Sequence, residues 1–343
     1  MAKKNLISDY TAKRFADIIN DVLNRAEEGK WQKPWFTPAF SGAPARNIDR
    51  PDPYQGFNAS LLSMVTAINN YRTPLFLTAD RARELGLKIR TIEINGKKMK
   101  EESYPVLKWL LRITDKEGNK ITEDEYDQLT KEEKDECRTR WHLRGYFVYN
   151  IDQTTMKEEL PKAYEKFCSL YKEPTDTLAP TEDAKDEALD YILSTQGAWR
   201  CPINHDGGNQ AYYSPMADRI SLPQKKYFKT TLGYYGTALH EMAHSTKGEA
   251  NMKRDYGRKK WGDEGYALEE LVAEFTSAFV CCDRGHTKQI DSSHVQYIQS
   301  WRKAISNKDI VSTIVDDLMR CVNYEIKYLR EVDELLYNKK NAA

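Results

Sequence analysis

The sequence has no long hydrophobic run, no paired cysteine motif and no excess of charge of either sign. No stretch approaches the ~18–20 apolar residues that a membrane-spanning helix needs, and the amino-terminal end lacks the apolar core of a signal peptide. The six cysteines form no Cys-x-x-Cys pair, so we expect reduced, mostly buried thiols. These absences predict a cytoplasmic protein that contacts no membrane.

The balance of 52 basic and 52 acidic residues argues against a strongly basic nucleic-acid binder and against an acidic DNA mimic. The charge is unevenly distributed. Residues 1–120 carry 21 Lys and Arg against 14 Asp and Glu, whereas residues 121–140 carry four against eight. We therefore expect a modest basic surface in the amino-terminal part. The 343 residues are enough for two domains of ~100–200 residues each.

The motif His-Glu-x-x-His occurs once, as His240, Glu241 and His244. On a helix, residues four apart lie on the same face, so both imidazoles can reach one metal ion. An ion held by two histidines and a third ligand keeps a position for water, and Glu241 can then accept the proton of that water. The alternative is an amphipathic helix that carries these three residues without a metal.

A second helix over residues 264–282 offers the third ligand. At 100° per residue, Glu270 and Glu274 share a side with small residues, which favours close approach to the histidine helix. We expect Glu270 to bind the metal and Glu274 to orient one of the histidines. Glu269 points about 100° away and is expected to be solvated. The rival third ligands are His205, His286 and His294.

An aromatic and proline-rich segment follows the first predicted helix. Trp31, Lys33 and Trp35 surround a proline, and a loop with further prolines and with Arg46 and Asn47 comes next. Aromatic rings interleaved with basic residues suit single-stranded nucleic acid, because bases stack on rings while Lys and Arg contact phosphates. The alternative is that both tryptophans anchor the loop on the core.

The pattern of apolar residues and turn signals predicts an α+β protein. In the first half we expect a helix over 8–28, a helix over 58–71 capped by Asn58, a short helix capped by Thr78, a hairpin of 88–94 with 97–100, antiparallel strands 104–114 and 141–151, and a charged, protruding end at 115–140. In the second half we expect a helix over 183–195, a strand over 210–223 and core-covering helices within 297–337.

The predicted strand at 210–223 is a candidate edge strand beside the histidine helix, where an extended substrate pairs by strand addition. The proline- and threonine-rich stretch within residues 156–182 predicts a connection. The expected domains are therefore 1–155, helices with a small antiparallel sheet, and 183–343, which carries the metal site.

These motifs resemble the ArdC-like antirestriction proteins of conjugative elements and phages. In the first domain the resemblance rests on residues 31–35, 54–58 and 146–153, and in the second on residues 211–215, 240–244 and 266–274. It implies an amino-terminal single-stranded-DNA-binding domain and a zincin-type metallopeptidase domain. Two departures are Glu101-Glu102-Ser103, where the family has a basic turn, and residues 115–140, which look like an insertion.

The resemblance implies a divalent ion, zinc or another such as manganese, at His240, His244 and a glutamate of the 269–274 run, with Glu241 as general base. The implied partners are single-stranded DNA and a protein or peptide substrate. The candidate DNA contacts are Trp31, Lys33, Trp35, Arg46, Asn47, Tyr54 and Asn58, and the candidate oxyanion donors are Tyr212, Tyr213 and Tyr266.

Two other functions remain open at this point. One is a non-enzymatic DNA-binding protector whose metal domain is a scaffold, and the other is a stand-alone metalloprotease whose aromatic loop only packs. Glu241 favours an enzyme, because a structural zinc site is normally closed by four protein ligands and needs no base.

Overall fold

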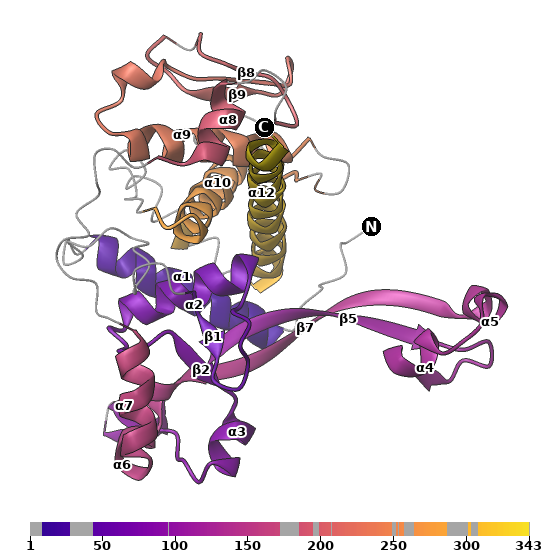
Figure 1. The fold of residues 1–343 in the computed structure, drawn as a ribbon. Coiled ribbons are helices and arrows are strands. Elements are labelled where there is room, and N and C mark those ends of the chain that lie inside the picture. The colour runs from indigo at the N-terminus through magenta and orange to yellow at the C-terminus, as the bar shows by residue number, and fades with distance from the viewer. Residues whose placement is uncertain are drawn as a thin grey trace.

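The computed structural model shows helices stacked over a sheet from which a long two-stranded arm extends (Figure 1). The α+β class predicted from the sequence is confirmed by the mixture of helices with antiparallel and parallel strand pairs. The described residues are 9–27, 44–94, 96–171, 185–194, 199–206, 208–248, 252, 254–256, 264–286, 301–302 and 308–342. The predicted contacts Trp31, Lys33 and Trp35 and the rival ligand His294 lie outside them.

The main sheet has five strands in the order β1-β2-β7-β5-β6. Their bounds are β1 Arg46–Asn47, β2 Leu75–Leu77, β5 Tyr104–Thr114, β6 Lys120–Ile121 and β7 Arg138–Asn150. The predicted antiparallel pair is confirmed, since β5 and β7 pair from Tyr104 opposite Val148 to Thr114 opposite Arg138. The predicted hairpin is confirmed as β3 Thr91–Ile94 and β4 Lys97–Lys100, with Gly96 at φ +75 in the turn.

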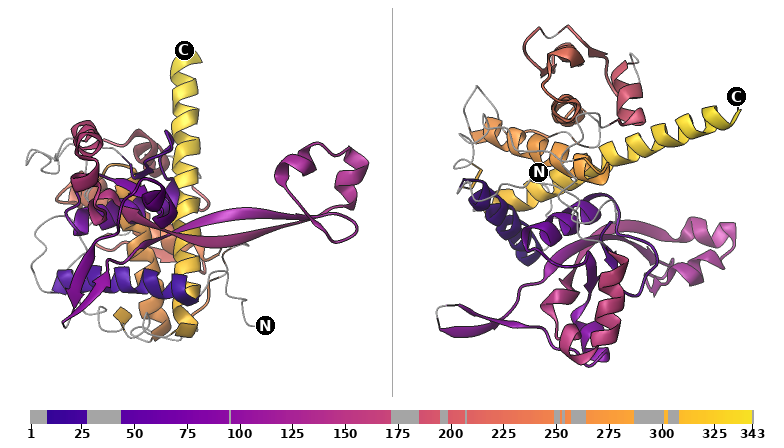
Figure 2. Two further views of the ribbon diagram at one scale, coloured as in Figure 1. Left: turned by 90° about the horizontal axis from the view of Figure 1, so that it is seen from below. Right: turned by 60° about the vertical axis from the view of Figure 1, so that its left-hand side comes forward.

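The charged segment forms the protruding end that the sequence predicts. After β5 the chain makes β6 and the short helices α4 Glu123–Asp127 and α5 Lys131–Glu136 at the tip of the arm (Figures 1 and 2). Both helices begin with a capping box, in which Thr122 pairs with Glu125 and Thr130 with Glu133. The tip therefore holds its local structure by capping rather than by burial.

Two helices, α1 Asp9–Glu27 and α2 Gly56–Ile68, pack on the body end of β5. The close approach of α1 depends on Gly145 of β7, because a Cβ added there would lie 2.8 Å from Thr11 Oγ1. The predicted cap of α2 was wrong, since Gln55 is the N-cap and Asn58 lies inside the helix. The Asn58 amide instead bonds both the N–H and the C=O of Leu107 in β5, at 2.9 and 2.7 Å.

The upper layer includes helices α9 Thr231–Thr246, α10 Glu264–Asp283 and α12 Lys308–Ala342. Helix α10 contacts α9, α12 and α2, and its residues 265–282 are all buried. Helix α2 is tied to this layer by the Ser60 hydroxyl, which donates to the Phe279 carbonyl at 3.1 Å. One core cluster therefore includes side chains on both sides of the predicted connection at 156–182, and the predicted domain bounds stay a prediction.

The predicted strand at 210–223 was wrong in part, because the structure has two short antiparallel strands there, β9 Tyr212–Ser214 and β10 Arg219–Ser221. The chain reverses through a turn in which Asp218 has φ +42, and Tyr213 donates a hydrogen bond to Asp218 across it. With β8 Ile203–Asn204 they form a sheet in the order β8-β10-β9, so β9 is an edge strand.

The remaining helices are α3 Ala79–Glu84, the 3₁₀ helix η1 Ile151–Gln153, α6 Met156–Glu159, α7 Pro161–Leu170, α8 Glu187–Ser194 and the 3₁₀ helix η2 Lys225–Tyr227. Thr78 caps α3 as predicted, accepting from Arg81 N at 3.2 Å. A second, smaller core lies among α3, α6 and α7. No helix in the described part of the chain is both long and apolar enough to cross a bilayer.

Candidate metal centre

Helix α9 carries His240, Glu241 and His244 on buried turns. The Thr230 side chain caps it by accepting a hydrogen bond from Gly233 N at 3.0 Å. The four-residue spacing stacks the two imidazoles on one face, and their Nε2 atoms lie 3.1 Å apart.

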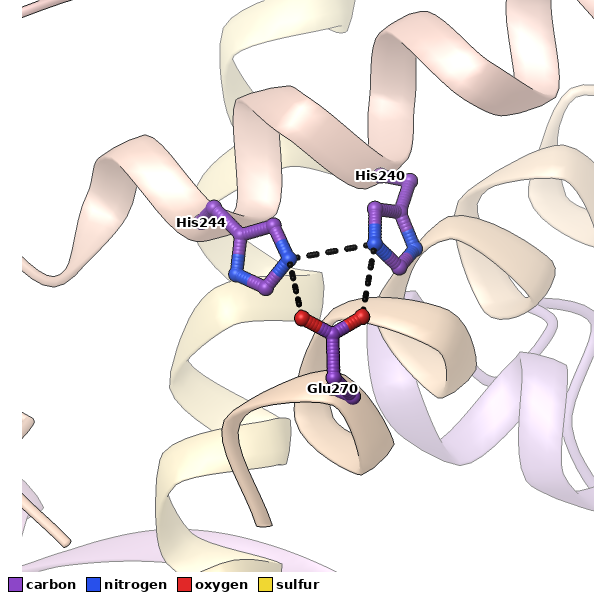
Figure 3. Close-up of side chains that lie close together, drawn as sticks. All are labelled: His240, His244 and Glu270. Atoms are coloured by element: carbon purple, nitrogen blue, oxygen red, sulfur yellow. Dashed lines mark hydrogen bonds and ion pairs between the residues drawn. The ribbon is translucent and has the colours of Figure 1, made fainter. Parts of the chain in front are cut away.

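Glu270 of α10 faces this pair from the neighbouring helix (Figure 3). Its Oε2 lies 3.4 Å from His240 Nε2 and its Oε1 lies 3.5 Å from His244 Nε2. Among the described residues, these three form the one cluster whose ligand atoms all lie within 4.8 Å of one another. The predicted ligand set is thus brought together in space.

The spacing of these atoms suits a tetrahedral ion. Ligand atoms at ~2.0–2.1 Å from zinc, separated by a tetrahedral angle, lie ~3.3–3.4 Å from each other. The two Nε2 atoms, 3.1 Å apart, come close to this requirement, and each has a different Glu270 oxygen near it, at 3.4 and 3.5 Å. Two imidazoles with one carboxylate are also a donor set that divalent transition metals accept, and three protein ligands leave a position for water.

The other ring nitrogens are held by two further carboxylates. His240 Nδ1 lies 3.1 Å from Glu274 Oε2, and His244 Nδ1 lies 3.2 Å from Glu269 Oε1. An ionised carboxylate only accepts hydrogen bonds, so each Nδ1 is the donor and each ring turns its Nε2 toward the cluster, where a neutral ring offers a lone pair to an ion. Glu274 therefore occupies the orienting position that we expected for it.

The expectation that Glu269 is solvated was wrong. Glu269 is 5% exposed and forms an ion pair with Arg254, whose Nη2 lies 2.8 Å from Oε1. The helix-wheel argument assumed solvent on one side of α10, whereas this helix is enclosed by neighbours on all sides. Arg254 also donates to the Ala243 carbonyl and to Thr246 Oγ1, at 2.8 and 2.7 Å, which fixes it against α9.

The electrostatics of the cluster favour a cation. Burial alone would lower the pKa of His244, but hydrogen bonds to Glu269 and Glu270 outweigh it and raise that pKa to about 10. Burial alone would raise the pKa of Glu270, but bonds from His240 and His244 hold it well below its usual range. Positive charge is therefore stabilised where the three ligand atoms meet.

Glu241 is 7% exposed and follows His240 directly on α9. Among the predicted oxyanion donors, Tyr213 donates to Asp218 at 2.8 Å, and burial raises its pKa to about 12. Tyr212, on edge strand β9, is 42% exposed, and Tyr266 is buried on α10. These three tyrosines and Glu241 stay predictions as to role.

The rival ligands have other partners. His205 Nε2 lies 2.7 Å from the Tyr234 hydroxyl, and burial lowers the pKa of His205. His286 Nε2 lies 3.1 Å from Asp186 Oδ2. Arg254 was not predicted from the sequence, because that residue comes from a segment without helical or strand periodicity.

The described candidate DNA contacts lie around β1 and α2. Arg46 and Asn47 form β1, and Asn47 Oδ1 accepts from Asp49 N at 2.9 Å. Tyr54 is partly buried, and burial with the neighbouring Tyr146 raises its pKa. The side-chain amide of Asn58 forms hydrogen bonds with the backbone N–H and C=O of Leu107. Their part in binding DNA stays a prediction.

Two protein families match successive parts of the chain. Residues 11–149 match the N-terminal domain of anti-restriction factor ArdC, and residues 187–313 match the zincin-like metallopeptidase family MPTase-PolyVal.

Solved structures of the antirestriction protein ArdC from plasmid R388 share this fold. The metal-free form has a TM-score of 0.54 at 25% identity over 93% of this chain and 97% of that one. The Mn(II)-bound form has a TM-score of 0.55 at 24% identity, over 92% and 96%.

Similar sequences occur in proteins much longer than this chain and in one of similar length. A DNA primase TraC of Escherichia coli is 29% identical over 87% of this chain but only 19% of its own length, so the chain spans about a fifth of that relative. Another DNA primase TraC of Escherichia coli is 29% identical over 82% of this chain and 24% of its own length. The uncharacterized protein y4eC of Sinorhizobium fredii is 24% identical over 88% of both chains. By these matches the chain has an ArdC-type amino-terminal domain followed by a zincin-like metallopeptidase domain, and it shares the fold of the antirestriction protein ArdC.

Proposed function

We propose that the carboxy-terminal part is a metal-dependent peptidase with Glu241 as its general base. The observation that carries this proposal is the convergence of His240 Nε2, His244 Nε2 and a Glu270 oxygen on one point beside a further carboxylate. When bound there, a divalent ion such as zinc or manganese supplies polarisation of a carbonyl and acidification of a water. Manganese is supported by the Mn(II)-bound form of the R388 protein.

The protein's own residues supply the rest of the chemistry. Glu274 and Glu269 hold the imidazoles in the tautomer that presents Nε2 to an ion. Glu241 accepts a proton from the attacking water and passes it to the leaving amine. A tyrosine among Tyr212, Tyr213 and Tyr266 donates a hydrogen bond to the oxyanion.

The edge strand β9 supports an extended peptide as the substrate. It contacts α9, and as the edge of its sheet it has backbone groups free to pair with an added strand. A segment of unfolded protein paired there runs beside the histidine helix.

The test of the peptidase is the substitution Glu241→Gln. It keeps the shape of the side chain but removes the proton acceptor, so we expect wild-type metal content and loss of casein cleavage by at least about a hundred-fold. Exposed Glu84→Gln on α3 is the matched control and should cleave normally. Unchanged cleavage by Glu241→Gln would refute the assignment.

We further propose that the amino-terminal part binds single-stranded DNA. The support is its match to the ArdC N-terminal domain and the aromatic and basic residues of the loop that includes Trp35. Trp35→Ala should weaken binding of a single-stranded oligonucleotide by about 1–3 kcal/mol without changing the salt dependence. Lys33→Ala or Arg46→Ala should flatten the salt slope by up to about one unit each.

Thermal melting separates the two explanations for Trp35. A large fall in the melting temperature of Trp35→Ala means that the ring packs on the core, and the stacking role is then wrong. An unchanged melting temperature with unchanged affinity removes the aromatic loop from the binding site. A Glu241→Gln protein that still protects DNA from restriction, and still binds single strands, would favour a non-enzymatic protector.

A further inference from the structure

The arm formed by β5 and β7 is a two-stranded ribbon that leaves the body of the protein (Figures 1 and 2). Residues directly opposite each other in an antiparallel pair point to the same face, and successive residues alternate between faces. The register therefore assigns every position of the arm to one of two faces.

One face of the arm is basic. Lys108 lies opposite Arg144, Arg112 lies opposite Arg140, and Arg138 lies opposite Thr114 at the end of the pairing. All five of these cations are exposed. We call this set, Lys108, Arg112, Arg138, Arg140 and Arg144, the basic face.

Two of these cross-strand pairs bring like charges together, which weakens an antiparallel pair. Within the described part of the chain, no carboxylate forms an ion pair with any of the five cations. Three acidic residues of the tip have other partners: Glu125 and Glu133 bond their capping threonines, and Glu136 pairs with Lys116. The like-charge pairs thus cost folding free energy, and no ion pair with a described residue offsets that cost.

We propose that the basic face binds the phosphate backbone of double-stranded nucleic acid. From residue 108 to residue 114 the ribbon is ~20 Å long at ~3.4 Å per residue. The same length of B-form duplex carries about twelve phosphates. A two-stranded ribbon also fits the major groove, which is ~12 Å wide. This goes beyond the proposed function, which concerns single strands and the loop around Trp35.

The side chains on the two faces favour a duplex over a single strand. Proteins that hold single strands stack bases on exposed rings. Trp109, which is exposed, lies opposite Leu143 and so belongs to the other face. Between the cations the register places Leu110 opposite His142, so cations outnumber rings on the basic face. Contacts to phosphates need only the cations.

The decisive variant is Lys108→Glu/Arg112→Glu in the full-length protein. It turns both like-charge pairs into opposite-charge pairs with Arg144 and Arg140, so the melting temperature should stay the same or rise. The matched control is Lys97→Glu/Lys100→Glu on β4, which has the same change in charge. Its exposed lysines lie opposite the neutral residues Ile94 and Thr91.

Binding is measured by fluorescence anisotropy with a DNA duplex of about 20 base pairs, long enough at ~3.4 Å per pair to cover the arm, and with one of its strands alone. We expect the arm variant to bind the duplex at least about ten-fold more weakly and to lower its salt slope by about two units. Its single-strand affinity and casein cleavage should stay close to those of the wild type. The control should bind the duplex like the wild type.

Three results would overturn the proposal. Equal losses in the arm variant and the control would mean that net charge alone matters. Loss of single-strand binding with normal duplex binding would make the arm part of the single-strand site. Normal duplex binding by the arm variant, with a loss of wild-type self-association in sedimentation, would mean that the basic face meets the acidic tip of a second copy.

Discussion

Two adjacent carboxylates, Glu269 and Glu270, have different partners at the metal centre. Glu270 faces both Nε2 atoms, whereas Glu269 bonds His244 Nδ1 and the buried Arg254. Removing either one changes the site, but for different reasons. Glu270 supplies a ligand atom, and Glu269 balances the charge of Arg254 and orients a ligand.

We predict that Glu269→Ala destabilises the protein by about 3–5 kcal/mol, because it leaves the Arg254 guanidinium buried without its carboxylate. It should also weaken metal binding by about 10–100-fold, because His244 loses the acceptor that orients it. Denaturant unfolding and competition with a metal chelator measure the two effects.

Glu270→Ala is the comparison, and it should lose the metal with a smaller loss of stability in the metal-free protein. If Glu269→Ala unfolds at the wild-type denaturant concentration and binds metal normally, then the contacts of Glu269 with Arg254 and His244 have no role in the site.

At the scale of elements, Asp186 joins α8 to the end of α10 and to α12. It accepts from Leu189 N in α8 at 3.0 Å and from Arg284 Nε at 2.7 Å, and Arg284 also pairs with Asp333 of α12. Burial alone would raise the pKa of Asp186, but hydrogen bonds from His286 and Arg284 hold it well below its usual range.

Because the folded-state pKa of Asp186 lies below its unfolded value of about 3.9, its contribution to stability is present above about pH 4 and is lost as the pH falls. Asp186→Asn should therefore cost about 1.5–3 kcal/mol near pH 7 and less at pH 3, where the unfolded-state carboxyl is already largely protonated. Urea unfolding at both pH values measures this difference.

Asp80→Asn, at an exposed ion pair with Arg83, is the control and should have little effect at either pH. A loss for Asp186→Asn that is equally large at pH 3 would contradict the linkage.

Local patterns were enough to predict several elements. The four-residue spacing of His240 and His244, the strand patterns of β5 and β7, the hairpin of β3 with β4 and the Thr78 cap all act over a few residues, and each appears where expected.

The errors came from contacts between distant segments. Asn58 looked like a cap, but it bonds Leu107, which lies 49 positions along the chain. Glu269 looked solvated, because neither the enclosure of α10 nor the position of Arg254 can be inferred from the periodicity of one helix. The turn at Asp218 divided a segment whose tyrosine and isoleucine content suggested a single strand.

At the scale of the whole molecule, the tip of the arm, residues 115–137, is structurally separate from the body. No residue from 115 to 137 belongs to either core cluster, whereas one cluster runs from α1 and α2 through α9, α10 and α12. The metal centre lies inside that core, and the acidic tip lies far from it on the arm (Figure 1).

We predict that residues 115–137 can be replaced by Asn-Gly. Thr114 and Arg138 are directly opposite in the register, so a two-residue turn can join them. The loss of β6, which uncovers Ile113, should cost about 1 kcal/mol, or about 2–4 °C in melting temperature. Metal content and casein cleavage should not change. A protein that fails to fold after this replacement would show that the tip supports the body.

The metal content of the purified protein tests the central claim most directly. After loading with zinc and desalting, elemental analysis should find one ion per chain in the wild type and in Glu241→Gln, and little or none in Glu270→Gln. A wild-type protein that holds no ion, or a Glu270→Gln protein that keeps it, would contradict the assignment of His240, His244 and Glu270 as the metal centre.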